Sequence, residues 1–204
     1  TLSPIVDFIA NNYEIPISID TRSSRVAMAF ERNNINFIND VSSGCHDSDM
    51  LDVVSKLGCS YIMTHMPREH KEGSIKVYDD ILSEIKTYFT DRIQKCVEAG
   101  ISKEKIIIDP GIGFGKSGEN NINLLKNIKW LKTIHSNVCI GSSNKRYSSQ
   151  LFKHIQTKED LRIANLATFA TSTFYGVTYL RVHDVGLTKD TVLVINKAVE
   201  LEQS

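Results

Sequence analysis

Several features that would assign a protein class at once are scarce or absent in this sequence. Its 204 residues include only four cysteines, none in a C-x-x-C pair, so neither a structural zinc site nor a redox motif is indicated. No apolar run approaches the roughly 18 residues of a membrane-spanning helix. The 24 Lys and Arg residues balance 24 Asp and Glu residues, which argues against a global electrostatic attraction to nucleic acid or anionic membranes. We therefore expect neither partner, and a cytoplasmic protein, with an organelle as the alternative.

The residues that are present are typical of an α/β protein. Hydrophobic residues make up 41% of the chain, which is enough for a sizeable core. Short β-branched runs, predicted as strands, lie at residues 15–20, 36–40, 60–64, 105–109, 137–141 and 178–183. Apolar residues recur at helical spacing in segments 4–11, 24–32, 49–56, 78–97, 120–131, 158–175 and 188–200. This alternation predicts one α/β domain over residues 1–204, either a doubly wound sheet or a (β/α)8 TIM barrel.

The predicted strands end in side chains that can bind ligands. These are Asp20, Thr21, Asn39, Asp40, His65, Asp109, Ser143, Lys145, Arg181 and His183. Because the carboxyl ends of parallel strands meet at one face, we expect these side chains to gather there. Carboxylates and an amide can read the donor-rich edge of a heterocycle, while the cations can hold phosphate or carboxylate oxygens. The pattern indicates a flat, nitrogen-rich, anionic substrate, although each residue alone could equally cap a helix.

Three familiar catalytic motifs are absent. The glycine-rich segment 109–117 reads DPGIGFGKS, and Pro110 stands where a phosphate-binding P-loop requires glycine. The chain also contains neither a nucleophile elbow nor an H-E-x-x-H zinc motif.

In segment 178–183, strand alternation would place Arg181 and His183 on the same face, where an inward-facing arginine needs an anionic partner.

At this point the sequence resembles the dihydropteroate synthases, the folate-pathway members of the pterin-binding enzymes. The matching stretches run in the family's order: PISIDT at 16–21, FINDVS at 37–42, MTHM at 63–66, IIIDPGIGFGK at 106–116, GSSNK at 141–145 and LRVHDV at 180–185. The combination of DPGIGFGK with RVHD is the most specific part of the match. The matching stretches cover nearly the whole chain.

The resemblance implies a (β/α)8 TIM barrel, of which this chain would supply about six units, strands three to eight. It implies a transferase that condenses 6-hydroxymethyl-7,8-dihydropterin pyrophosphate with p-aminobenzoate, giving 7,8-dihydropteroate and pyrophosphate. The residues that would bind the pterin are Asp20, Asn39, Met63, Asp109, Gly113, Phe114, Lys145 and Arg181. Arg181, His183 and Thr21 would bind the pyrophosphate, and Ser143, Asn144 and Lys145 would lie on the p-aminobenzoate side. Lys145, Arg181 and His183 would be catalytic.

The same resemblance implies Mg²⁺ as a cofactor, with its ligand expected upstream of Thr1 and none in this chain. It further implies a homodimer, a sulfonamide target and a possible fusion to other folate-pathway domains. On this interpretation residues 1–204 alone would be weakly active or inactive. The family's Ser-Arg-Lys reads Ser143-Asn144-Lys145 here, which leaves a catalytically silent pterin-binding paralogue as one alternative. A pterin-dependent methyltransferase acting on methyltetrahydrofolate is the other, and Arg181 with His183 argues against it.

Overall fold

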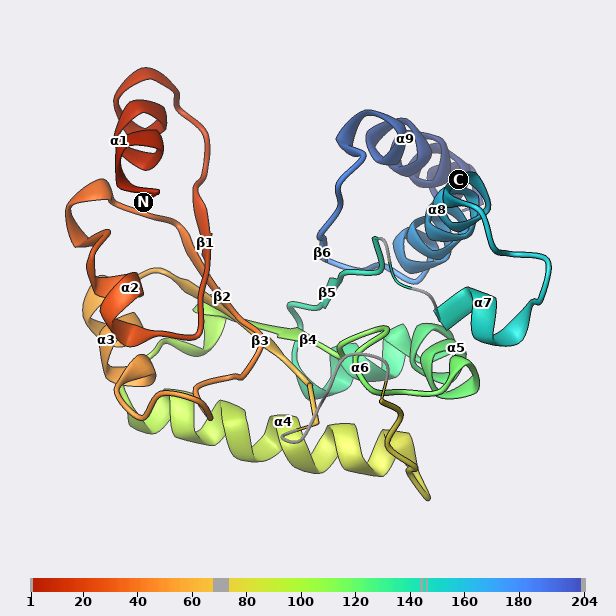
Figure 1. Cartoon of the computed structure of the whole chain (residues 1–204), viewed down its shortest axis with the longest axis horizontal. Helices are drawn as coiled ribbons and strands as arrows, with labels where there is room; N and C mark the ends of the chain where they lie inside the picture. Colours follow the sequence, from red (N-terminus) through yellow and green to blue (C-terminus); the bar gives the residue numbers. More distant parts are fainter. Residues whose placement is uncertain (1, 68–73, 144, 146, 203–204) are drawn as a thin grey trace. The chain divides into compact units, whose positions relative to one another are not determined.

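The structure, a computed structural model, describes residues 2–67, 74–143, 145 and 147–202 (Figure 1). In these ranges six parallel strands are each followed by helical structure, as the alternation predicts. The strands are β1 (Ser18–Asp20), β2 (Phe37–Asp40), β3 (Ser60–Thr64), β4 (Ile106–Asp109), β5 (Cys139–Ile140) and β6 (Tyr179–Leu180). The helices are α1 (Ser3–Asn12), α2 (Ser24–Met28), α3 (Met50–Leu57), α4 (Ile81–Glu98), α5 (Gly118–Lys126), α6 (Ile128–Ile134), α7 (Tyr147–Leu151), α8 (Lys158–Phe174) and α9 (Val185–Glu202). Short 3-10 helices span Glu31–Asn33 and Lys103–Lys105.

The chain forms two compact units. Unit 1 comprises Thr1–His65 and Tyr88–Ile108, and unit 2 comprises Met66–Thr87 and Asp109–Ser204. That they constitute one domain stays a prediction. None of the described helices is both long and apolar enough to cross a membrane.

The strands β1 to β4 form one sheet, in the order β1-β2-β3-β4. The pairing of β1 with β2 is parallel and places Asp20 beside Asn39, so two strand-end residues of different segments become neighbours. All four residues of β4 are buried, as are four of the five residues of β3. Burial on both faces is what a parallel sheet between helices requires, and it explains why these strands read as continuous apolar runs.

The apolar stripe predicted in segment 78–97 corresponds to α4. Its residues Ile81, Ile85, Phe89 and Cys96 are buried at helical spacing, so one side of the helix packs and the other is solvated. In unit 2, α8 packs against α9. The helix α8 begins with a capping box, because the Thr157 side chain accepts from the Asp160 N–H and the Asp160 carboxylate accepts from the Thr157 N–H.

Two predicted helices differ from the structure, and one short helix was not predicted. The predicted helix 120–131 is two helices, because Asn127 leaves helical geometry and its side chain donates to the Asn123 carbonyl oxygen at 2.8 Å. The helix predicted over 24–32 ends at Met28 and is followed by a 3-10 turn. The helix α7 was not predicted, because five residues are too few to show a helical period.

The prediction that Arg181 and His183 lie within a strand is also wrong. The strand β6 ends at Leu180, and the Arg181 N–H donates to the Ile140 carbonyl oxygen as the last ladder bond. Two residues further along the chain, the His183 N–H donates to the Ser143 hydroxyl at 3.2 Å rather than to a main-chain carbonyl oxygen. The ladder therefore stops because a side chain replaces the main-chain acceptor.

Candidate active site

In unit 1 the predicted pterin-binding residues Asp20 and Asn39 form a hydrogen-bonded pair. The Asn39 Nδ2 donates to Asp20 Oδ2 at 2.7 Å, and Asn39 is buried while Asp20 is exposed. The Thr21 N–H donates to the Asn39 carbonyl oxygen at 3.0 Å, which extends the β1–β2 pairing by one residue. The two strand ends therefore carry a carboxylate that is hydrogen-bonded to an amide. The carboxylate oxygens can accept from the N–H groups of a heterocycle.

Asp40, another strand-end candidate, is committed to its own loop. Its buried carboxylate accepts from the Tyr61 hydroxyl, the Ser42 N–H and the Gly44 N–H, each at 2.7 Å. Burial, together with the negative charge of Asp40, raises the pKa of Tyr61 well above its usual value, so this phenol stays a donor. These bonds hold the loop after β2, and Asp40 is therefore a structural residue.

The remaining unit 1 candidates lie in the core at the end of β3. Met63 is fully buried, with its sulfur 3.4 Å from the Cys96 sulfur. His65 is also buried, and its ring lies edge-on to the Tyr88 ring at a centroid distance of 4.8 Å. Packing accounts for both positions, and a ligand role for Met63 stays a prediction.

In unit 2 a buried carboxylate lies against an arginine. Asp109 ends β4 with its side chain fully buried, and its Oδ1 accepts from the Gly111 N–H at 2.8 Å. Its Oδ2 lies 2.8 Å from Arg181 Nη2, and the arginine side chain is 33% exposed. The expected anionic partner of Arg181 is thus Asp109, and the guanidinium lies between a buried carboxylate and the solvent.

The main chain at Gly141 provides the space for this arginine. A Cβ at this position would lie 2.6 Å from Arg181 Nη2 and 2.9 Å from Cζ. Gly113 does the same for Lys145, because a Cβ there would lie 2.8 Å from the Lys145 Cβ, and its φ of +79° also favours glycine. Both cations therefore cross the main chain at positions where any side chain would interfere.

Lys145 is held against the aromatic ring of the glycine-rich segment. Its Nζ lies 3.6 Å from the centroid of the Phe114 ring, within the range of a cation–π interaction. Asp109, Gly113, Phe114, Lys145 and Arg181 therefore belong to one unit, which brings together five residues predicted from three separate sequence motifs.

Ser143 and His183 both line a cavity of about 540 Å³ between α8 and α9, together with Lys158, Arg162 and Asn165. This adjacency places a residue of the predicted p-aminobenzoate side next to one predicted to bind pyrophosphate. Asn144 lies outside the described residues, so its predicted role stays a prediction.

Sequence reasoning assigned no role to Lys116, although this residue is built into the same segment. Its side chain is buried, and its Nζ donates to the carbonyl oxygens of Gly111 at 2.9 Å and Phe114 at 3.1 Å. Burial lowers the pKa of Lys116 to about 7, while the nearby charges of Asp109 and Glu84 act in the opposite direction. The lysine after a glycine run was visible in the sequence, but its burial was not.

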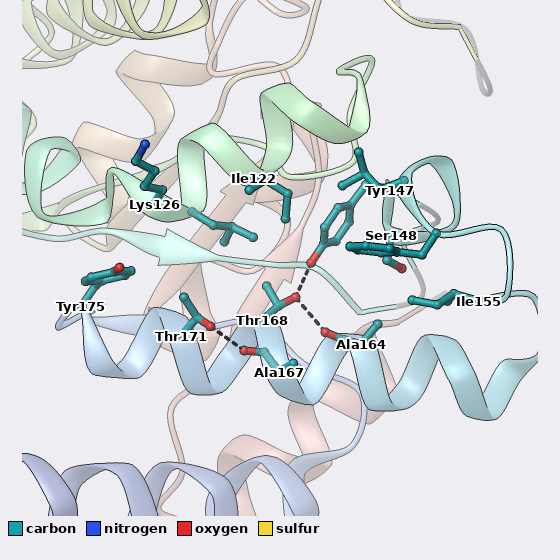
Figure 2. Close-up of a pocket in the computed structure, with 13 residues that line it drawn as sticks. Ile122, Lys126, Tyr147, Ser148, Ile155, Ala164, Ala167, Thr168, Thr171 and Tyr175 are labelled. Carbon is teal, nitrogen blue, oxygen red and sulfur yellow. Dashed lines mark hydrogen bonds between the residues drawn. The ribbon is translucent and has the colours of Figure 1, made fainter.

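A second cavity lies apart from every predicted site residue (Figure 2). It has a volume of about 420 Å³ and is lined mainly by apolar side chains of α5, α7 and α8. The Tyr147 hydroxyl contacts Thr168 Oγ1, which itself donates to the Ala164 carbonyl oxygen at 2.9 Å. Lys126 is the charged residue among the lining side chains, and no predicted site residue contributes to this cavity.

Within residues 2–67, 74–143, 145 and 147–202, no three His, Cys, Asp or Glu side chains are close enough together to hold a metal ion. Asp20 pairs with an amide and Asp109 with a guanidinium, so the strand-end carboxylates do not form a cluster. The described residues do not fit a Mg²⁺ site made by protein ligands alone.

Comparison with known proteins identifies the family. The sequence model of the pterin-binding enzymes matches residues 1–183. Dihydropteroate synthase from Escherichia coli strain K12 is 30% identical over 204 residues, which cover 98% of this chain and 71% of that protein.

Solved structures agree with this assignment. Dihydropteroate synthase from Yersinia pestis, in complex with a pterine–sulfa conjugate, aligns with a TM-score of 0.87 at 28% identity, covering 97% of this chain and 74% of that one. The Xanthomonas albilineans enzyme with 4-aminobenzoic acid aligns with a TM-score of 0.86 at 31% identity, covering 97% of this chain and 69% of that one. These alignments confirm the α/β TIM-barrel class and do not favour the methyltransferase alternative. The chain belongs to the pterin-binding enzyme family and, within it, to the dihydropteroate synthases.

Proposed function

We propose a role for each site residue of this chain in the dihydropteroate synthase reaction. In that transferase reaction of folate biosynthesis, the amine of p-aminobenzoate replaces pyrophosphate on the methylene carbon of the dihydropterin. The carbon–oxygen bond to pyrophosphate breaks, and its electron pair leaves with the phosphate oxygen. The amine nitrogen then forms a bond to the methylene carbon and loses a proton. These reaction steps need no protein nucleophile, and the amino-acid sequence contains no nucleophile elbow.

Asp109 is assigned to the pterin ring. A buried carboxylate can accept from the pterin amino group and from the adjacent ring N–H. Its Oδ2 faces Arg181 at 2.8 Å, so the pterin's donors would replace the guanidinium there. Asp20 and Asn39 carry the same chemistry in unit 1 and keep their assignment to the pterin, as do Met63, Gly113 and Phe114.

Arg181, Lys145 and His183 are assigned to the charge that develops as pyrophosphate departs. In the substrate complex, positive groups that face the pyrophosphate stabilise this charge as it develops, which lowers the barrier electrostatically. The single observation that carries the proposal is the Asp109–Arg181 pair, because it places a pterin acceptor next to a phosphate-binding cation. Thr21 is retained as a pyrophosphate ligand, and Ser143 and Asn144 as residues on the p-aminobenzoate side.

The test uses the full-length protein with dihydropterin pyrophosphate and labelled p-aminobenzoate. We expect labelled dihydropteroate and equimolar pyrophosphate from the wild type, and a loss of at least about 100-fold in kcat/KM for Arg181→Gln. Lys197→Gln is the matched control, because Lys197 forms only a solvent-exposed ion pair with Glu200 on α9. Binding of the pterin substrate without any product would instead establish the silent paralogue.

Mg²⁺ is part of the proposal as a partner of the substrate. Phosphate oxygens commonly supply most of the ligands of Mg²⁺ in phosphate-transfer sites, together with one or two carboxylates. The described residues do not form a metal site, so the roles assigned to them do not depend on a metal ion held by the protein. We expect turnover to fall on addition of EDTA and to return with added Mg²⁺, and equal rates in both conditions would remove Mg²⁺ from the proposal.

We also propose a homodimer in the cytoplasm. Support for self-association comes from exposed apolar side chains on α8 and α9, including Ile163, Leu193 and Val194. Sedimentation of the full-length protein at several concentrations should give twice the monomer mass, and Leu193→Glu should shift the equilibrium to monomer. Fractionation of the source cells tests the cytoplasmic location. Fusion to other folate-pathway domains is read directly from the complete gene.

A further inference from the structure

Lys116 is an unusual residue for the interior of a protein. It is only 1% exposed and ranks among the largest fully buried side chains, whereas lysine is almost never buried unless its ammonium is paired. It lies in unit 2, as do Asp109, Phe114, Lys145 and Arg181. The reaction steps proposed above leave this ammonium without a task.

The geometry shows a clamp around the turn that carries Phe114. The Lys116 Nζ bonds the carbonyl oxygens at both ends of the turn, those of Gly111 and Phe114. On the other side, Asn121 Oδ1 accepts from the Gly113 N–H at 2.8 Å, and Asn121 Nδ2 donates to the Lys116 carbonyl oxygen at 3.1 Å. Two side chains thus fix the main chain at four points, and the Phe114 ring is held where Lys145 contacts it.

The charges around Lys116 come from three parts of unit 2. Asp109 at the end of β4 and Glu84 in α4 favour the ammonium, while Lys145 and Lys76 disfavour it. Asp109 is itself paired with Arg181 in the ligand-free chain. The charge on Lys116 therefore depends on whether Arg181 is in place, because Arg181 offsets the carboxylate that favours the ammonium.

We propose that Lys116 is a positioning residue with two tasks: it clamps the turn that carries Phe114, and its ammonium replaces Arg181 as the counter-charge of Asp109 when the arginine moves to pyrophosphate. The inference rests on the proposed function, in which the pterin and the arginine compete for Asp109 Oδ2. A neutral amine still has two N–H donors for the two carbonyl oxygens, so the clamp holds in both protonation states. Only the counter-charge changes with pH.

This mechanism predicts that the protein takes up a proton when it binds dihydropterin pyrophosphate. Once Arg181 moves away, the unscreened Asp109 raises the pKa of Lys116 from about 7, so an amine that was largely neutral at pH 8 becomes charged. Affinity should then rise as the pH falls from 9 to 7, by up to about tenfold per pH unit.

Calorimetry of the full-length protein at pH 8, in two buffers with different ionisation enthalpies, measures this uptake directly. We expect a clear fraction of a proton per substrate for the wild type, little for Lys116→Met and little for Lys116→Arg, whose charge is permanent. Lys126→Met on the exposed side of α5 should match the wild type. Subtracting the Lys116→Met uptake removes protonation of the pyrophosphate itself.

Lys116→Arg keeps both a cation and its donors, so it carries the test if Lys116→Met does not fold. Equal proton uptake by wild type and Lys116→Arg would overturn the counter-charge task. An unchanged kcat/KM in a folded Lys116→Met would overturn the clamp. Either result leaves dihydropteroate formation by the wild type intact, whereas absence of that product contradicts the proposed function itself.

Discussion

Replacing Gly141 with alanine tests whether Arg181 owes its position to a missing side chain. The new Cβ would lie 2.6, 2.9 and 3.0 Å from the Nη2, Cζ and Nε atoms of the guanidinium. Ordinary contact begins at 3.4 Å, so Nη2 must retreat by about 0.8 Å, the difference between 3.4 and 2.6 Å. The backbone of Gly141 does not have a positive φ, so the substitution adds no backbone strain.

The magnitude follows from the contact that this retreat breaks. Arg181 Nη2 and Asp109 Oδ2 form an ion pair at 2.8 Å, and a retreat of 0.8 Å directed away from the carboxylate lengthens it to about 3.6 Å. Exposed ion pairs contribute up to about 1 kcal/mol and buried ones more, so we take about 1.5 kcal/mol as the upper bound for a buried carboxylate and an arginine that is 33% exposed. Misplacing a catalytic group by about 1 Å can cost on the order of 100-fold in rate. We therefore expect a 10- to 100-fold loss in kcat/KM with about 1.5 kcal/mol or less of destabilisation.

The assay is steady-state formation of dihydropteroate by the full-length variant, together with its urea unfolding. Gly186→Ala is the matched control, because a Cβ there meets nothing within 4 Å. We expect Gly186→Ala to keep wild-type kinetics. If Gly141→Ala also kept the wild-type kcat/KM while folded, the guanidinium would not depend on this contact, and the argument would be refuted.

Three further predictions address other parts of the chain. Asn39→Ala removes the 2.7 Å bond to Asp20 and should weaken pterin binding about tenfold in calorimetry, with a melting temperature within a few degrees of wild type. Tyr61→Phe removes one donor of the buried Asp40 carboxylate and leaves those of Ser42 and Gly44, and urea unfolding should show about 1–3 kcal/mol of destabilisation. Because the unfolded Lys116 binds a proton that the folded state has largely lost above about pH 7, wild-type stability should rise between pH 7 and 9 relative to Lys116→Met, by up to about 1.4 kcal/mol per pH unit. A stability difference independent of pH would contradict this assignment.

The elements that the sequence predicts well are those buried on both faces. The strand predicted at 60–64 matches β3 residue for residue, because a continuous apolar run between polar ends has only one placement in a parallel sheet. Segments with weaker signals lost residues at their ends, as β5 and β6 did, since short ladders depend on partners that lie far along the chain. The break at Asn127 likewise depends on a side chain bonding the preceding turn.

In the candidate site too, the sequence predicts the residues that strand ends place, and it misses those whose position depends on contacts with other segments. Strand ends predicted Asp20, Asn39 and Asp109, because a parallel sheet places such residues in register. Lys116 was missed for the opposite reason. Its burial arises from bonds to carbonyl oxygens that the sequence does not display, and a lysine after a glycine run is most simply read as a solvated or phosphate-binding cation.

Gly113 of DPGIGFGK and Gly141 of GSSNK show most clearly what a sequence alone does not predict. In a sequence, glycine indicates a backbone conformation that other residues avoid, and Gly113 with a φ of +79° meets that description. Gly141 has no such conformation, and the space occupied by the Arg181 guanidinium is the physical reason for its lack of a side chain. The glycine that begins GSSNK and the arginine that begins RVHD therefore act as one feature, since each accounts for the position of the other.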